Sequence, residues 1–139
     1  MAANEWKLKK SDTGVKTILA PIASATVIAA GRLVESSSGL IVDGTATGAA
    51  LAWTPTGSAD GETTIEITEG NDFTLLGTGD AVFAAAQRGT EVDLVVNATV
   101  QQIDVGSSST DVLKIQHSND SGTVGSASNI EVRINKPIV

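Results

Sequence analysis

The side chains best suited to chemistry are few in this sequence. It contains one histidine, His117, and no cysteine, which excludes disulfides, thiol catalysis and cysteine-ligated zinc. A metal site at His117 would have to recruit carboxylates such as Asp120, and a Ser–His–Asp arrangement would depend on this one imidazole. His117 ends an alternating segment on the parity of Leu113 and Ile115, which favours a histidine packed or hydrogen-bonded for structure. We therefore expect no catalytic residue and no metal site.

Three further patterns could carry chemistry, and each has a simpler interpretation. Residues 77–80, Gly-Thr-Gly-Asp, lack the ending of a phosphate-binding loop and read as a turn. Glu62, Glu66 and Glu69 could form a glycosidase-like pair only in a cleft with aromatic rings, and a solvated strand face explains them better. Residues 118–122 are rich in oxygen ligands but lack the spaced acidic set of a calcium loop, so only weak calcium binding stays open. No cofactor is expected.

Composition narrows the classes of partner. The chain has 139 residues, a formal net charge of −7 and a sequence pI near 4.5, which argues against nucleic acid and anionic membranes. Only 3% of the residues are aromatic, too few for the stacking platforms that bind sugars or nucleobases. Charged residues make up only 18%, which fits a protein that hides part of its surface in an assembly.

The positive charge is concentrated at the start of the chain. Residues 1–16 carry four lysines against Glu5 and Asp12, whereas the other 123 residues carry five basic and fourteen acidic side chains. Such a segment is typical of an arm that docks on an acidic surface, for example a neighbouring copy, and the alternative is a solvated, disordered start. Trp6, beside Leu8, either folds onto its own domain or anchors in a partner's pocket.

The apolar run over residues 15–31 needs a structural interpretation. It superficially resembles the apolar part of a signal peptide, but acidic residues precede it and Pro21 interrupts it. It is also too short to span a bilayer. We expect two strands joined at Pro21.

The elements that position these side chains are strands. Over residues 91–100 the apolar side chains Val92, Leu94 and Val96 share one parity, which predicts a half-buried strand of ten residues. The parity switches after Gln101 and Gln102, which predicts a bulge or bend near Gln101. Alternation also marks residues 62–69, 111–117 and 129–135. Shorter strands are expected over residues 16–20, 26–29, 32–35, 40–43, 49–53, 73–76 and 81–84.

About ten short strands separated by turns every eight to twelve residues predict one all-β domain, a β-sandwich or a small β-barrel. Its expected bounds are residues 15–139, preceded by a flexible N-terminal arm over residues 1–14. One helical turn is expected over residues 84–88, with Gly89 as its C-cap.

Long stretches of the chain resemble the small structural proteins of tailed bacteriophages, above all the head decoration, or cement, proteins. The resemblance rests on residues 18–53, ILAPIASATVIAAGRLVESSSGLIVDGTATGAALAW, on residues 91–116, EVDLVVNATVQQIDVGSSSTDVLKIQ, and on the abrupt NKPIV end. It implies a β-rich protein, commonly trimeric, on the capsid exterior at three-fold positions. It also implies contacts that lock neighbouring capsomers together and, in some members, an N-terminal arm inserted into the shell.

These observations lead to one functional hypothesis and one alternative. We expect a virion structural protein, made in the host cytoplasm, that decorates and stabilises a capsid as a homotrimer bound to the major capsid protein. Trp6, Leu8, Lys9 and Lys10 are predicted to contact a neighbouring chain or the capsid protein, so that removal of residues 1–12 would leave the fold intact. The alternative is a carbohydrate-binding or adhesive β-module on a virion or cell surface.

Overall fold

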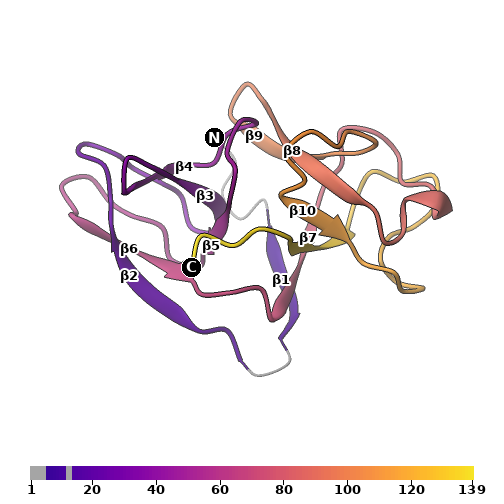
Figure 1. Cartoon of the computed structure of the whole chain (residues 1–139), viewed down its shortest axis with the longest axis horizontal. Coiled ribbons are helices and arrows are strands. Elements are labelled where there is room, and N and C mark those ends of the chain that lie inside the picture. The colour runs from indigo at the N-terminus through magenta and orange to yellow at the C-terminus, as the bar shows by residue number, and fades with distance from the viewer. Residues whose placement is uncertain (1–5, 12–13) are drawn as a thin grey trace.

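A computed structural model describes residues 6–11 and 14–139 and consists almost entirely of strands and loops (Figure 1). The all-β prediction is confirmed. The strands are β1 (Lys7–Ser11), β2 (Thr17–Pro21), β3 (Arg32–Ser37), β4 (Leu40–Asp43), β5 (Ala52–Thr54), β6 (Thr64–Thr68), β7 (Phe73–Gly77), β8 (Glu91–Asn97), β9 (Val100–Asp104), β10 (Leu113–Ile115) and β11 (Ile130–Ile134). One 3₁₀ turn, η1 (Ala85–Gln87), lies where the sequence predicts a helical turn, and the φ of Gly89 after it is +78°.

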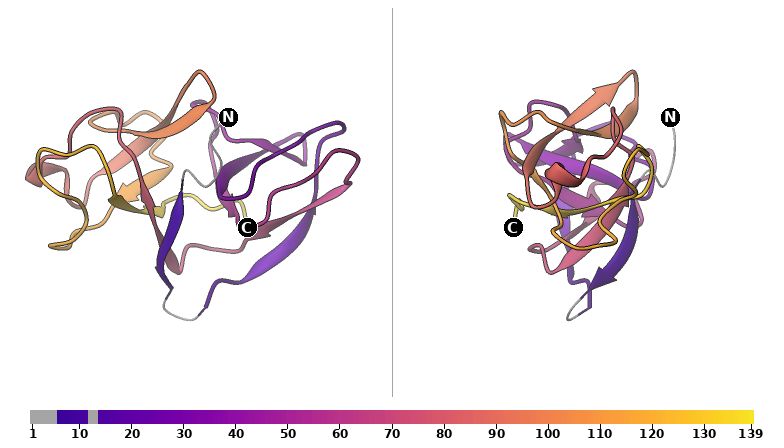
Figure 2. Two further views of the ribbon diagram at one scale, coloured as in Figure 1. Left: turned by 180° about the vertical axis from the view of Figure 1, so that it is seen from behind. Right: turned by 90° about the vertical axis from the view of Figure 1, so that its right-hand side faces the viewer.

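The strands form antiparallel sheets arranged as in a sandwich. The largest sheet has the order β1-β7-β11-β10-β8-β9, and smaller sheets have the orders β2-β6 and β4-β3-β5. Figure 1 shows β2 to β6 in one lobe and β8 to β10 in the other, with β1 and β7 between them. The view from behind in Figure 2 shows the C-terminal segment running back between the lobes. There it bonds Leu51, whose N–H donates to the Lys136 carbonyl at 2.9 Å.

Two apolar clusters form the core, and both consist of the inward parity of alternating strands. The larger one lies under the six-stranded sheet and unites side chains such as Leu75, Leu94, Ile103 and Val132. The smaller one, which includes Ile41, Ile65 and Ile67, fills the lobe formed by β2, β6, β3 and β4. The alternation over residues 62–69 and 129–135 therefore predicts correctly that Ile65, Ile67 and Val132 are buried.

The ten-residue strand predicted over residues 91–100 is wrong, because the chain reverses inside it. β8 ends at Asn97, which pairs with Val100 at the start of β9, and Ala98 takes a positive φ of 56° in the turn between them. The change of parity at Gln101 comes from the turn of this hairpin, so of the predicted bulge or bend the structure has a bend, which reverses the chain. A tight hairpin without glycine at the positive-φ position lacks the usual sequence signal.

Two of the shorter predicted strands are loops. Over residues 26–29 only Ile28 pairs, through an isolated bridge to Ser58. Residues 81–84 lead into η1, and the N–H of Phe83 donates to the carbonyl of Ser126 at 2.8 Å. In both segments one apolar side chain, Ile28 or Phe83, is buried and fixes the loop, which explains the strand-like pattern.

Candidate interaction surface

Trp6 belongs to the core of its own chain. Only 1% of its surface is exposed, and an ideal Cβ on Gly77 would lie 2.2 Å from its Cζ3 atom, so the ring covers the backbone of β7 directly. Its indole N–H donates to the Gln101 Oε1 atom at 3.1 Å. The prediction that Trp6 contacts a neighbouring chain or the capsid protein is therefore wrong, since its own domain covers the ring. Of the two alternatives for Trp6, the structure shows the intramolecular one.

The buried side chain of Gln101 joins β9 to β3 and to the Trp6 ring. Its Oε1 atom also accepts the N–H of Leu33 at 2.9 Å, and its Nε2 atom donates to the Leu33 carbonyl at 2.8 Å and to the Gly44 carbonyl at 3.2 Å. Buried amides are stable in a core only when such bonds replace those to water. The sequence carries one signal for this role, because Gln101 shares the inward parity of Ile103.

Strand β1 forms one edge of the six-stranded sheet and contains the other three predicted contact residues. It pairs with β7 and has an irregularity between Leu8 and Lys10. Leu8 is 43% exposed and Lys10 is exposed, so both are available to a partner. The remaining one, Lys9, is bound within the chain. Removal of residues 1–12 would delete β1 and Trp6 together, so the structure leads us to expect that such a truncation destabilises the fold.

Lys9 binds two carboxylates. Its Nζ atom lies 2.7 Å from the Asp120 Oδ2 atom and 3.4 Å from the Glu131 Oε1 atom. The hydrogen bond to Asp120 is the main reason that the pKa of Lys9 is raised, and the same bond lowers the pKa of Asp120. The oxygen-rich loop over residues 118–122 was considered above for weak calcium binding. In the structure its carboxylate, Asp120, binds the Lys9 ammonium group. Glu131, expected to be solvated, is buried because β1 brings Lys9 over it.

A hollow of about 140 Å³ lies beside this ion pair on the outer side of the sheet. Lysine, arginine, histidine and carboxylate side chains line it, namely those of Lys9, Lys10, His117, Asp120, Glu131 and Arg133, together with Gln116 and Ser118. His117 is exposed there, and its imidazole forms no hydrogen bond within the described residues, whereas the sequence favours a histidine packed or hydrogen-bonded for structure. Within the described residues Lys10 forms no ion pair, so the hollow offers a free ammonium group.

Asp93 is a second buried carboxylate on the outer parity of the sheet. The N–H groups of Ser109, Thr110 and Asp111 all donate to it at 2.8–2.9 Å. Burial alone would raise its pKa, but the bonds from Asp111, Ser109 and Thr110 prevail and lower the pKa to about 2. Asp93 therefore closes the loop between β9 and β10, a role that nothing in its own strand signals.

Two of the three glutamates considered for a glycosidase-like pair have structural partners. The Glu66 carboxylate accepts bonds from the hydroxyls of Thr17 at 2.8 Å and Thr56 at 3.2 Å. Glu62 accepts the N–H of Ala59 at 3.1 Å and closes a turn. Within the described residues no group of three or more histidine, aspartate or glutamate side chains is placed to hold a metal ion.

Exposed apolar side chains gather at the far end of the lobe that contains β8 and β10. Val82 is 58% exposed and Val124 is 59% exposed. Their segments lie side by side, because Phe83 exchanges backbone hydrogen bonds with Gly125 and Ser126. The alanines of this end are exposed as well, so we define the Val82 patch as Ala81, Val82, Ala84, Ala85, Ala86 and Val124. The buried ring of Phe83 holds it in place.

The four aromatic side chains lie inside the molecule. Trp6, Trp53, Phe73 and Phe83 are at most 9% exposed. Trp53 packs against Phe73 with ring centroids 6.5 Å apart, and its buried indole N–H has no hydrogen-bond partner among the described residues. Rings so placed stabilise the core and provide no surface on which a sugar could stack.

Comparisons with known proteins add no identification. No family model, no curated protein and no solved structure matches this chain. In the part of the chain that the structure describes, no helix has the length and apolar character needed to cross a membrane.

Proposed function

We propose that this chain is a virion structural protein that decorates and stabilises a phage capsid, bound across capsomer seams as a homotrimer. In this proposal its partners are the major capsid protein and two further copies, and its place is the capsid exterior. The observation that carries the proposal is the Val82 patch, an exposed apolar surface on the segment that leads into η1 and on the adjacent segment that contains Val124. Together with the resemblance to decoration proteins, it favours binding to another protein over catalysis.

The physical basis is burial of apolar surface at a seam. Covering a valine side chain contributes about 1.5–3 kcal/mol when it becomes fully buried, so Val82 and Val124 can anchor a contact. A trimer that engages three equivalent seams gains avidity from linked weak contacts. A protein that binds only the expanded shell stabilises that shell by about 2.7 kcal/mol per site at a hundredfold excess over the dissociation constant.

Co-sedimentation with expanded capsids that lack a decoration protein tests the proposal. The wild-type chain should pellet with capsids, and Val82→Glu should reduce its affinity at least tenfold, because a charge would be buried in the contact. Val100→Glu, a matched change at a residue 37% exposed in the hairpin of β8 and β9, should pellet like the wild type. A wild-type chain that stays in the supernatant, or equal loss in both variants, would contradict the proposal.

The alternative of a carbohydrate-binding module gains no support from the surface. Sugar-binding faces present aromatic rings to solvent. All four rings of this chain are buried, as described above.

A further inference from the structure

Five basic side chains lie on the outer side of the six-stranded sheet of an acidic protein. Residues directly opposite each other in a sheet share a face, and the pairs Lys10–Thr74, Lys114–Arg133 and Lys7–Leu76 lie on the side of the hollow. We define the basic face as Lys7, Lys9, Lys10, Lys114 and Arg133. Five carboxylates accompany these five cations, those of Glu91, Asp93, Asp104, Asp120 and Glu131. The rest of the chain has four basic and eleven acidic side chains, so this side of the sheet is balanced in charge whereas the remainder is acidic.

The hollow is the centre of the basic face. Its volume of about 140 Å³ corresponds to a few waters at about 30 Å³ each, which is room for one short acidic side chain. Lys9 is already bound to Asp120 and Glu131, but Lys10 has no ion-pair partner among the residues that the structure describes. Arg133 uses one nitrogen to bond the Asn71 carbonyl at 2.7 Å and has further donors. An incoming carboxylate would therefore find one ammonium and one guanidinium group.

The opposite lobe carries a complementary feature. Residues 17–68 contain five acidic side chains and one basic side chain, Arg32, which is buried and bound to Asp43. The acidic turn, which we define as residues 59–62 (Ala-Asp-Gly-Glu), is exposed throughout. Its shape is fixed by the bond from the Ala59 N–H to Glu62 and by Gly61, whose φ is +84°. Asp60 lies at its tip.

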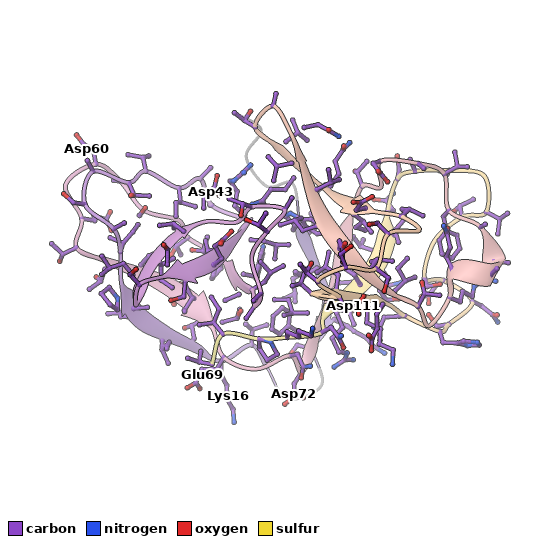
Figure 3. All side chains as sticks on the ribbon, turned by 45° about the horizontal axis from the view of Figure 1, so that its top comes forward. Lys16, Asp43, Asp60, Glu69, Asp72 and Asp111 are labelled. Atoms are coloured by element: carbon purple, nitrogen blue, oxygen red, sulfur yellow. The ribbon has the colours of Figure 1, made fainter. Side chains whose placement is uncertain are left out.

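We propose that the acidic turn of one copy binds in the hollow of a second copy, with the Asp60 carboxylate between Lys10 and Arg133. Figure 3 shows Asp60 at the free end of the lobe that contains β2 and β6. Figure 1 places β10, whose Lys114 belongs to the basic face, in the other lobe, so a second copy has to provide the turn. A contact between two different surfaces repeats from copy to copy and closes into a ring when the rotation allows it. This inference rests on the homotrimer in the proposed function and specifies its interface.

Charge reversal on each side of the contact tests the inference. The basic-face variant is Lys10→Glu with Arg133→Glu, and the acidic-turn variant is Asp60→Lys. Their controls are Lys16→Glu with Lys136→Glu, and Asp72→Lys, which change the charge equally at exposed positions elsewhere. The measurement is molar mass by light scattering over a range of protein concentrations at low salt, without capsids.

The wild-type chain and both controls should self-associate, and each reversal variant should do so at least tenfold more weakly. Neither reversal variant should associate well alone, but a mixture of the two should, because the intact turn meets the intact hollow and the reversed turn meets the reversed hollow. Combining all three substitutions in one chain should restore association, which also shows that the variants fold. A wild-type chain that remains monomeric, or a triple variant that does not regain association, would overturn the inference.

Capsid attachment, measured separately by co-sedimentation, distinguishes this inference from the proposed function. A monomeric wild-type chain that pellets with capsids would overturn the interface and leave decoration supported. A chain that associates through the two charged surfaces but ignores capsids would support the interface and contradict decoration.

Discussion

The two sides of strand β1 are attached to the protein in different ways. On the inner side, Trp6 just before the strand is 1% exposed and bonded to Gln101. On the outer side, Lys9 is joined to Asp120 and Glu131 by an ion pair that water can reach, since the Asp120 side chain is 71% exposed. Burial of a large ring stabilises far more than an ion pair in contact with water. The inner side therefore fixes the strand, and the outer side stays free to bind a partner.

The largest effect is expected from Trp6→Ala. Removing a fully buried tryptophan costs about 3–5 kcal/mol, and here it also leaves Gln101 without one of its donors. Chemical unfolding followed by the fluorescence of Trp53 measures the loss. The control is Leu8→Ala on the same segment, which should change stability by less than about 1 kcal/mol because Leu8 is 43% exposed. Similar losses in the two variants would show that burial of the Trp6 ring is not what holds the strand in place.

An intermediate effect is expected from Asp93→Asn, because this outer carboxylate is bound by backbone N–H groups that the fold holds in place. The pKa of Asp93 in the folded protein, about 2, is below its ordinary value of 3.8, so the carboxylate contributes stability above about pH 4 that is lost as the pH falls toward 2. The contribution is about 2 kcal/mol at neutral pH.

Unfolding curves at pH 7, 4 and 2.5 check this prediction. The free energy of unfolding of the wild type should exceed that of Asp93→Asn at pH 7, and the difference should shrink as the pH falls to 2.5. Asp72→Asn, a change at an exposed aspartate, serves as the control and should follow the wild type at every pH. A constant difference between the wild type and Asp93→Asn would mean that the ionised carboxylate is not the source of the stability.

The smallest effect is expected from Lys9→Met, which keeps most of the apolar stem and removes the charge. Stability should fall by about 1 kcal/mol, since the stronger of the two contacts, that to Asp120, is exposed and Glu131 borders the hollow. Unfolding is measured at about 0.05 M and about 1 M salt. The difference in free energy of unfolding between the wild type and Lys9→Met should be smaller at the higher salt concentration. A loss as large as that of Trp6→Ala would mean that the ion pair, and not the ring, holds β1 in place.

Local patterns predicted the strands well and the partners of individual side chains poorly. The alternation of residues 129–135 placed Ile130, Val132 and Ile134 in the core, where they lie. The same alternation placed Glu131 in solvent, and it is buried because a strand more than a hundred residues earlier brings Lys9 over it. Asp93 is buried for a similar reason, since a loop that follows it folds back over its carboxylate.

The sequence by itself determined an acidic all-β domain, because period-two alternation and turn residues act locally and leave few other ways to bury the apolar side chains. It also determined that the lysines of the first sixteen residues stand apart from an acidic remainder. Only the tertiary structure decided that Trp6 is core, that Gln101 joins β9 to β3, and that Lys10 and Arg133 meet in one hollow. Each of these depends on strands distant in sequence becoming neighbours in a sheet, and the order of strands is set by the packing of the whole chain.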